Sequence, residues 1–151
     1  MKHIPLTQGK FAIVDDEDYE KVSQLKWYPF YPRKRGTCYA HTSRGQLMHR
    51  FILGLGAGDP QTDHRNGNGL DNRRENLRRC TNSENNRNKG KQCNNKSGFK
   101  GVSWDKKDRR WIARIKTDSV YKYLGGFKTP ELASEAYKQA AVEFHGEFAR
   151  I

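Results

Sequence analysis

The chain contains few cysteines and no long apolar run. Three cysteines occur among its 151 residues, Cys38, Cys80 and Cys93, and no two of them form a Cys-x-x-Cys pair. An odd number of thiols without that spacing argues against both a disulfide framework and a four-thiolate zinc site. No apolar run approaches the roughly 20 residues of a membrane span, and the N-terminus MKHIPLTQGK lacks the apolar centre of a signal peptide. We therefore expect a cytoplasmic protein with no membrane partner.

Hydrophobic and acidic residues are also scarce. Only 34% of the residues are hydrophobic, which favours two or three small packed units over one large core. Lys and Arg number 29 against 17 Asp and Glu, so the net charge is +12. The excess is +3 over residues 1–48, +5 over residues 49–97 and +4 over residues 98–151. A positive charge distributed in this way indicates a protein that lies along a polyanion. Nucleic acid is the main candidate, and a ribosomal or merely soluble basic protein is the alternative.

Residues 1–45 are expected to form a small, strand-rich α/β segment that contacts DNA. The hydrophobic pattern predicts short strands around residues 4–6, 10–14, 27–31 and 39–41. It also predicts a helix that starts at the acidic residues 15–20 and turns Val22 and Leu25 inward. The basic turn PRKRG between the last two strands is a candidate phosphate-facing loop, although solvated hairpin tips have the same composition.

The next segment, residues 46–90, opens with LMHRFILGL. Leu47, Phe51 and Leu55 recur at helical spacing in it, which predicts a short helix with these three residues on one face. We expect His49, on the same helix, to pack or to contact a phosphate rather than to bind a metal.

The candidate catalytic residues lie in QTDHRNGNGLDNRRENLRRCTNSENNRN, residues 61–88. Residues 62–64 are predicted to end a strand, because the NGNG that follows supplies residues that tolerate positive φ. Residues 76–81 alternate as a returning strand would, and Ser83 can then cap a short helix that contains Asn85. The order is therefore strand, loop, strand and helix.

In such a unit Asp63 and Asn85 can approach one another around a single cation. Both offer hard oxygen ligands, which suit Mg²⁺ or Mn²⁺ better than zinc. His64 points to the other side of the strand from Asp63, so it can face a substrate phosphate. A neutral imidazole with a pKa near its ordinary value of about 6.5 can take a proton from water at neutral pH. Asn76, on the paired strand, could hydrogen-bond to the imidazole and fix its tautomer.

Two other interpretations of the same residues remain open. Counted from His64, four residues fall at positions 3, 5, 6 and 12 of a calcium loop: Asn66, Asn68, Gly69 and Glu75. The first position of such a loop should be Asp, two arginines lie inside this one, and no convincing amphipathic helix precedes it. The third interpretation is a hairpin whose Asn and Gly residues only make turns.

The Asp63-His64 pair, the NGNGLDN turn, Asn76-Leu77 and the SENNRN tail resemble the HNH nuclease family, over about residues 47–90. The closest likeness is to the phage and intron-encoded homing endonucleases with a ββα-metal site. The resemblance implies that His64 is the general base, that Asp63 is a metal ligand and that Asn76 orients the histidine. Asn85 stands where the last metal ligand of the motif falls. That position is often His in the family, whereas the homing branch also uses Asn.

After a polar linker at residues 91–97, residues 98–151 read as a three-stranded antiparallel sheet followed by one helix. In the middle strand Trp111, Ala113 and Ile115 share one face, opposite to that of Arg114 and Lys116. Thr129-Pro130 predicts the start of the helix. Its apolar stripe, which would pack on the sheet, comprises Ala133, Ala136, Tyr137, Ala140, Ala141 and Phe144. The fold class expected for the whole chain is α+β.

The free face of this sheet is rich in basic and aromatic residues, as is typical of a ribbon that enters the major groove. The expected DNA-binding residues are Lys100, Lys106, Arg110, Arg114, Lys116, Tyr121 and Tyr123. GFKGVSWD, WIARIK, YLGGF and TPELASEAYKQAAVEFHG resemble the plant Apetala/ethylene-response-factor domain, in which the sheet reads DNA. The plant domains carry more Arg, a Glu and a Trp on that face, so their base specificity does not carry over.

Together the two resemblances imply a site-specific DNA endonuclease of the homing type. We expect a monomer that acts on double-stranded DNA, has no small-molecule substrate and works in the cytoplasm of a bacterial host cell. It would use one divalent metal, Mg²⁺ or Mn²⁺, and nick rather than cut both strands at once. Two alternatives are a DNA-binding protein without catalysis, derived from such a nuclease, and an RNA-binding or RNA-processing protein.

Overall fold

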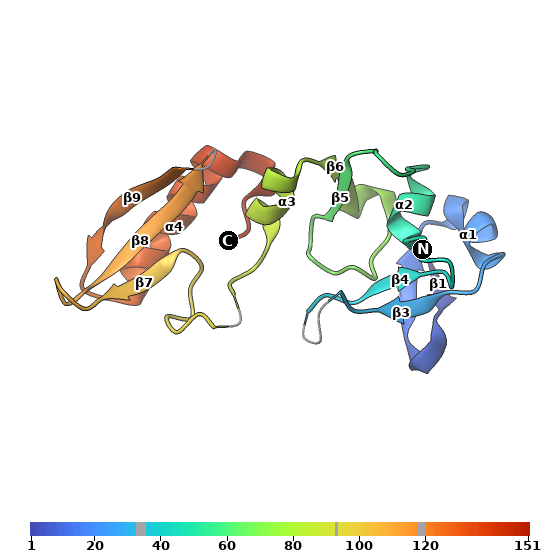
Figure 1. Ribbon diagram of the computed structural model, residues 1–151, viewed down its shortest axis with the longest axis horizontal. Coiled ribbons are helices and arrows are strands. Elements are labelled where there is room, and N and C mark those ends of the chain that lie inside the picture. Colours follow the sequence, from blue (N-terminus) through green and yellow to red (C-terminus); the bar gives the residue numbers. More distant parts are fainter. Residues whose placement is uncertain (33–35, 93, 118–119) are drawn as a thin grey trace. The chain divides into compact units, whose positions relative to one another are not determined.

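The computed structural model describes residues 1–32, 36–92, 94–117 and 120–151 (Figure 1). In these residues the chain is mixed α and β, with four small antiparallel sheets and four α-helices. It forms two compact units, Met1–Asn82 and Ser83–Ile151. Arg33, Lys34 and Arg35 of the expected phosphate-facing turn, and Cys93, lie outside the described residues.

The first unit begins with a hairpin and a helix. Strand β1 (Lys2–Pro5) pairs with β2 (Phe11–Val14) across the 3-10 turn η1 (Thr7–Gly9). Helix α1 (Asp16–Ser23) follows, and the three acidic residues in its first turn favour helix initiation. Val22 is buried, as expected, but Leu25 is 38% exposed because it lies after the end of the helix. Trp27 takes the inward position and donates its indole N–H to the carbonyl of Val22 (2.8 Å).

A second hairpin and a short helix complete the core of this unit. Strand β3 (Tyr28–Phe30) pairs with β4 (Tyr39–His41), and α2 spans only Met48–Ile52. The expected helical face of Leu47, Phe51 and Leu55 is therefore wrong. The chain leaves the helix at Gly54, whose φ of 65° is not helical, and the helix residues that become buried are Met48, His49 and Ile52.

Strands β5 (Gln61–His64) and β6 (Leu77–Cys80) form the third hairpin, with the short 3-10 helix η2 (Arg74–Asn76) before β6. The loop between them is held against the N-terminal hairpin by main-chain bonds. Ile13 donates to the carbonyl of Leu70 (2.8 Å) and accepts from the N–H of Asn72 (2.8 Å). Because of these bonds, residues 1–45 and the loop after His64 belong to one folded unit.

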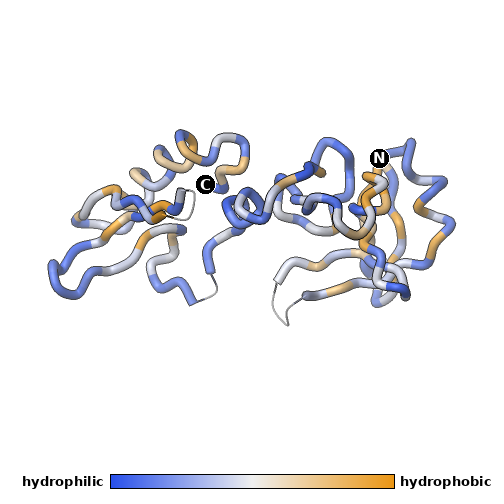
Figure 2. The backbone as a smooth tube through the Cα atoms, turned by 45° about the horizontal axis from the view of Figure 1, so that its top comes forward, coloured by the Kyte–Doolittle hydropathy of each residue, from blue (hydrophilic) through white to orange (hydrophobic). Residues whose placement is uncertain are grey.

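The second unit contains the three-stranded sheet expected from the sequence, in the order β7 (Val102–Asp105), β8 (Arg110–Thr117) and β9 (Val120–Phe127). Helix α4 (Pro130–His145) packs on it, with Thr129 as N-cap, and the 3-10 turn η3 (Gly146–Phe148) follows. Ile115 packs with Tyr137, Ala140 and Ala141, and in Figure 2 the coil of α4 carries both orange and blue stretches, as a helix with one apolar face should.

The segment before the sheet is ordered by its own hydrogen bonds. Helix α3 spans Asn82–Asn88, so Ser83 lies in its first turn rather than at its cap. The Ser97 hydroxyl donates to the carbonyl of Val102 (2.9 Å), and the Asn95 amide donates to that of Phe99 (2.8 Å). The expected linker at residues 91–97 is therefore fixed to the sheet at its C-terminal end. No helix in the described part of the chain is long and apolar enough to cross a membrane.

Candidate active site and DNA-binding face

His64 ends β5 and lies inside the first unit, where it is only 4% exposed. Strand alternation places its side chain opposite to that of Asp63, as the sequence predicted. Its Nε2 atom lies 3.4 Å from Oδ1 of Asn72, an amide that is itself fully buried. The sequence had assigned this contact to Asn76, and nothing in the residue pattern distinguished Asn72 from the other loop asparagines.

Three aromatic rings meet at this point, and they come from three different elements. The His64 ring centroid lies 5.0 Å from that of His49, on α2, and 5.6 Å from that of Tyr39, on β4. Tyr39 and His49 are 5.7 Å apart, so each of the three rings touches the other two. His49, which the sequence suggested as a packing or phosphate-contacting residue, therefore lies beside the candidate base.

Burial sets the protonation state of the two imidazoles. Removal from water lowers the pKa of His64, against the opposing effects of the Asn72 amide and the carboxylates of Asp63 and Asp71. Burial, together with the neighbouring His64 and Arg50, lowers the pKa of His49 to about 3. Both rings are consequently neutral at pH 7, the state in which His64 can accept a proton.

Asp63 forms a buried ion pair on the other side of the hairpin. Arg78 stands directly opposite on β6, and its Nη2 and Nε atoms donate to Oδ2 of Asp63 at 2.7 and 2.9 Å. Both residues are buried. The sequence did not anticipate this arginine. A cation on Asp63 would therefore share the carboxylate with a fixed positive charge.

Asn76 lies in η2, one residue before β6, and so is not part of the returning strand as expected. Its Oδ1 accepts the N–H of Asn66 (3.0 Å), and its Nδ2 donates to the carbonyl of Asp71 (2.7 Å). The expectation that Asn76 hydrogen-bonds to the imidazole is corrected by these contacts. Its amide instead ties together the two ends of the loop that presents Asn72.

The loop is anchored by two arginines as well. Arg73 pairs with Asp71 through Nε and Nη2 (2.8 and 2.7 Å), and this lowers the pKa of the Asp71 carboxyl. Arg74 pairs with Asp18 on α1 through Nε and Nη2, both at 2.8 Å. The acidic cluster of Asp15, Glu17 and Asp18 surrounds Arg74, which makes it an anchor for the loop.

The calcium-loop alternative loses its ligands in this arrangement. Oδ1 of Asn66 accepts the N–H of Asn68 (2.8 Å), and Oδ1 of Asn68 accepts that of Leu70 (3.1 Å). Glu75 is paired with Arg73. These side chains build the turn itself.

Asn85 lies on α3 and is half-buried. It belongs to the second unit, whereas Asp63 belongs to the first. The joint binding of one cation by Asp63 and Asn85 stays a prediction.

The outer face of the C-terminal sheet gathers four of the expected DNA-binding residues. Arg114 stands opposite Tyr123, and Lys116 stands opposite Tyr121, so all four side chains share the face that α4 leaves open. Tyr121 and Tyr123 are 68% and 54% exposed. The described part of the chain places no carboxylate within ion-pair distance of either cation. This free, basic and aromatic surface is what contact with a polyanion requires.

The other three expected DNA contacts differ among themselves. The Arg110 side chain lies over Gly126 on the same outer face, and exposed Lys106 is in the turn between β7 and β8. Lys100 precedes β7, and its ammonium donates to the carbonyl of Arg87 at the end of α3. Burial, with Arg150 nearby, lowers the Lys100 pKa to about 8. Lys100 thus holds the end of α3 in the DNA-free chain, and its assignment to DNA binding stays a prediction.

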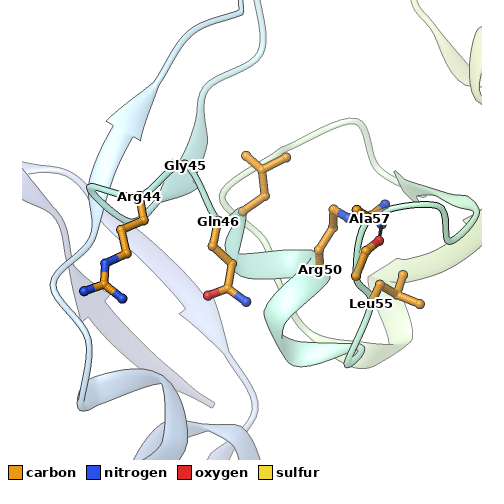
Figure 3. Close-up of a pocket in the computed structure, with 8 residues that line it drawn as sticks. Arg44, Gly45, Gln46, Arg50, Leu55 and Ala57 are labelled. Atoms are coloured by element: carbon orange, nitrogen blue, oxygen red, sulfur yellow. Dashed lines mark hydrogen bonds between the residues drawn. The ribbon is translucent and has the colours of Figure 1, made fainter.

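A surface cavity of about 340 Å³ lies elsewhere in the first unit (Figure 3). Loop residues on both sides of α2 line it, including Arg44, Gln46 and Leu55. Arg50 reaches across it and donates to the carbonyls of Gly56 and Pro60, which fixes the connection between α2 and β5. The cavity contains neither His64 nor Asp63, so the candidate chemistry lies outside it.

Comparison with known proteins found one relative that covers almost the whole chain. The protein named "Uncharacterized HNH endonuclease L560" from Acanthamoeba polyphaga mimivirus is 30% identical over 147 residues, which are 94% of this chain and 74% of that protein. "Protein 3.8" of Escherichia phage T7 is 32% identical over 89 residues, 59% of this chain and 73% of that protein. The "AP2-like ethylene-responsive transcription factor TOE2" of Arabidopsis thaliana is 40% identical over 55 residues, 36% of this chain and 11% of that protein. No family model and no solved structure matches.

Proposed function

This chain belongs to the family of HNH endonucleases, and we propose that it is a site-specific DNA endonuclease of the homing type, in which His64 is the general base. The observation that carries the proposal is the buried, neutral imidazole of His64, held by the Asn72 amide and two aromatic rings at the end of β5. An imidazole that is neutral at pH 7 can accept a proton from water at that pH.

In the proposed reaction His64 takes a proton from a water molecule. The resulting hydroxide oxygen bonds to phosphorus, and the bond from phosphorus to the 3′ oxygen breaks. The products are a 5′ phosphate and a 3′ hydroxyl, whose proton comes from solvent. Asn76 acts as a positioning residue here, because it ties the loop that carries Asn72.

Asp63 and Asn85 are the proposed ligands of one divalent cation, Mg²⁺ or Mn²⁺. Their carboxylate and amide oxygens are hard donors and fit such an ion. Bound there, the cation supplies positive charge that stabilises the charge building up on the phosphate and on the leaving oxygen. A single metal and a single base suit the cutting of one strand at a time.

DNA binding is assigned to two surfaces. The first is the outer sheet face formed by Arg114, Lys116, Tyr121 and Tyr123, with Arg110 and Lys106 beside it, and the similarity to an AP2-like transcription factor supports this. The second is the β3–β4 hairpin of the first unit. Residues 21–58, which include it, contain seven Lys and Arg and no Asp or Glu. We propose double-stranded DNA as the substrate, a monomer as the active form and the cytoplasm of a bacterial host as the setting.

A DNA-binding protein without catalysis is the second candidate, and one observation favours it. The Asp63 carboxylate is already paired with Arg78, and both side chains are buried. In a protein that only bound DNA, both groups could serve as core polar residues.

Cleavage of supercoiled plasmids that carry random or phage DNA distinguishes the two candidate functions. Purified protein would be incubated with these plasmids in Mg²⁺, in Mn²⁺ and in EDTA, with His64→Ala and His3→Ala alongside. His3 is an exposed histidine of the same unit and controls for the loss of an imidazole. We expect metal-dependent conversion to open-circular DNA, unchanged in His3→Ala and slowed roughly 10² to 10⁴ fold in His64→Ala. Tight, salt-sensitive binding without cleavage in either metal would establish the second candidate.

A further inference from the structure

We propose that His49 and Tyr39 form a ring clamp that positions the His64 imidazole for proton transfer, so that His49 is a positioning residue of the nuclease. The inference rests on the proposed function of His64. It gives a role to a buried histidine that the proposed reaction leaves unused.

The clamp is built from elements that the fold fixes independently. The His49 ring meets that of His64 edge to face at 5.0 Å with an interplanar angle of 89°, and Tyr39 approaches at 5.6 Å. The loop between β5 and β6 packs closely against Tyr39, because a Cβ built on Gly69 would lie 2.6 Å from the Cδ1 atom of Tyr39. The side-chain amide of Asn72 contacts Nε2 of His64, and the main chain of Asn72 is itself hydrogen-bonded to Ile13. The imidazole therefore has little freedom to rotate.

His49 acts in this clamp through its ring and not through a charge or a hydrogen bond. Its Nδ1 atom is buried and has no hydrogen-bond partner among the described residues. Its lowered pKa agrees with a ring that stays neutral. A buried nitrogen without a partner costs stability, so a phenyl ring at this position should preserve the contact and leave no polar atom unpaired.

Ordinary core packing is the competing explanation, and neighbouring Met48 provides the comparison. Met48 is fully buried on the same helix and packs in the main core cluster of the unit, but it takes no part in the ring cluster. A residue that matters only for folding should behave as Met48 does.

The test compares His49→Phe, His49→Leu and Met48→Ala in the full chain. His49→Leu fills the space without a flat ring, so it avoids the cavity that alanine would leave. Each variant would be assayed for its single-turnover cleavage rate at saturating plasmid DNA, for its DNA Kd and for its thermal midpoint. We expect His49→Leu to cleave about 10 to 100 fold more slowly with a Kd within about twofold of wild type, because small misplacements of reacting groups cost this much. His49→Phe should recover most of that rate, and Met48→Ala should melt earlier yet cleave normally when folded.

Two outcomes would overturn the clamp. Equal rates in His49→Leu and wild type would show that volume alone suffices, and equal slowing in His49→Phe and His49→Leu would show that a nitrogen is needed. Failure of the proposed function gives a different pattern, because His64→Ala would then cut as fast as wild type or the wild type would not cut at all.

Discussion

Two adjacent residues of β5 experience opposite electrostatic environments. Asp63 is buried against Arg78, and its charge is compensated within the hairpin. His64, one residue later, faces aromatic rings and an amide, and burial lowers its pKa. Strand alternation separates the two environments, so a charged carboxylate and a neutral imidazole can coexist at neighbouring positions.

The buried histidines should make the first unit sensitive to acid. The His49 pKa is about 3 in the folded chain and about 6.5 in an unfolded one. Between these values the unfolded chain binds one more proton, so stability falls as the pH drops below about 6.5, by about 1.4 kcal/mol per pH unit. At pH 5 the loss from His49 is about 2 kcal/mol.

The substitution His49→Phe removes the titrating imidazole and therefore its share of the stability loss at acid pH. Urea denaturation followed by circular dichroism would give the free energy of unfolding of both proteins at pH 7 and pH 5. We expect wild type to lose about 2 kcal/mol more than the variant over that interval. The second unit and His64 are present in both proteins, so their contributions largely cancel. An identical loss of unfolding free energy in the two proteins would show that folding does not lower the pKa of His49.

At the residue scale, the sequence predicted those features that depend on residues close together in the chain. The opposite directions of Asp63 and His64 follow from strand alternation alone, and the structure confirms them. Asn72 was missed because its position depends on main-chain bonds to Ile13, 59 residues earlier in the chain. Arg78 was missed as the partner of Asp63 because the register of the hairpin decides which residues stand opposite, and a loop of this length does not fix that register.

At the scale of elements, the loop between β5 and β6 carries the contacts that shape the candidate site. It pairs with β2 through its main chain, with α1 through Arg74, and with β4 at Gly69. Such contacts explain why residues 1–45 belong to the same unit as His64.

Gly69→Ala should disturb this loop. A Cβ there would lie 2.5 Å from the Cys38 carbonyl oxygen and 2.6 Å from Cδ1 of Tyr39, so the loop or β4 must move. Overpacking of this kind costs typically about 1 to 3 kcal/mol, and it would displace Tyr39 from His64. We expect a lower thermal midpoint and slower plasmid cleavage. Gly56→Ala is the matched control, because a Cβ there would meet only Oδ2 of Asp59, at an ordinary contact distance of 3.9 Å. Equal behaviour of the two variants would contradict the close approach at Gly69.

The elements themselves were predictable to different degrees. The C-terminal sheet and α4 followed from alternation, from the Thr129-Pro130 start and from the alanine stripe, all of which are local signals. The length and the buried face of helix α2 were predicted wrongly, because the apolar run LMHRFILGL is compatible both with a longer helix and with a short helix followed by a turn. Gly54, with its positive φ, decides where the chain turns.

At the scale of the whole molecule, the candidate general base and the outer sheet face lie in different units. His64 and its clamp lie entirely in Met1–Asn82, whereas the basic outer sheet face lies entirely in Ser83–Ile151. Substitutions on the outer sheet face should therefore change DNA binding without changing the His64 cluster.

Arg114→Ala and Lys116→Ala test this division. If each side chain neutralises one DNA phosphate, each substitution should reduce the slope of log K against log salt by about 0.9. Fluorescence anisotropy with duplex DNA between about 50 and 200 mM salt would measure the slope. Lys138→Ala is the control, since Lys138 lies on α4 and faces Glu135 at 3.6 Å. At saturating DNA the cleavage rate should stay at the wild-type value in all three variants, because none of them touches the His64 cluster. A slower saturated rate with an unchanged salt slope would instead place the sheet face in the cutting step.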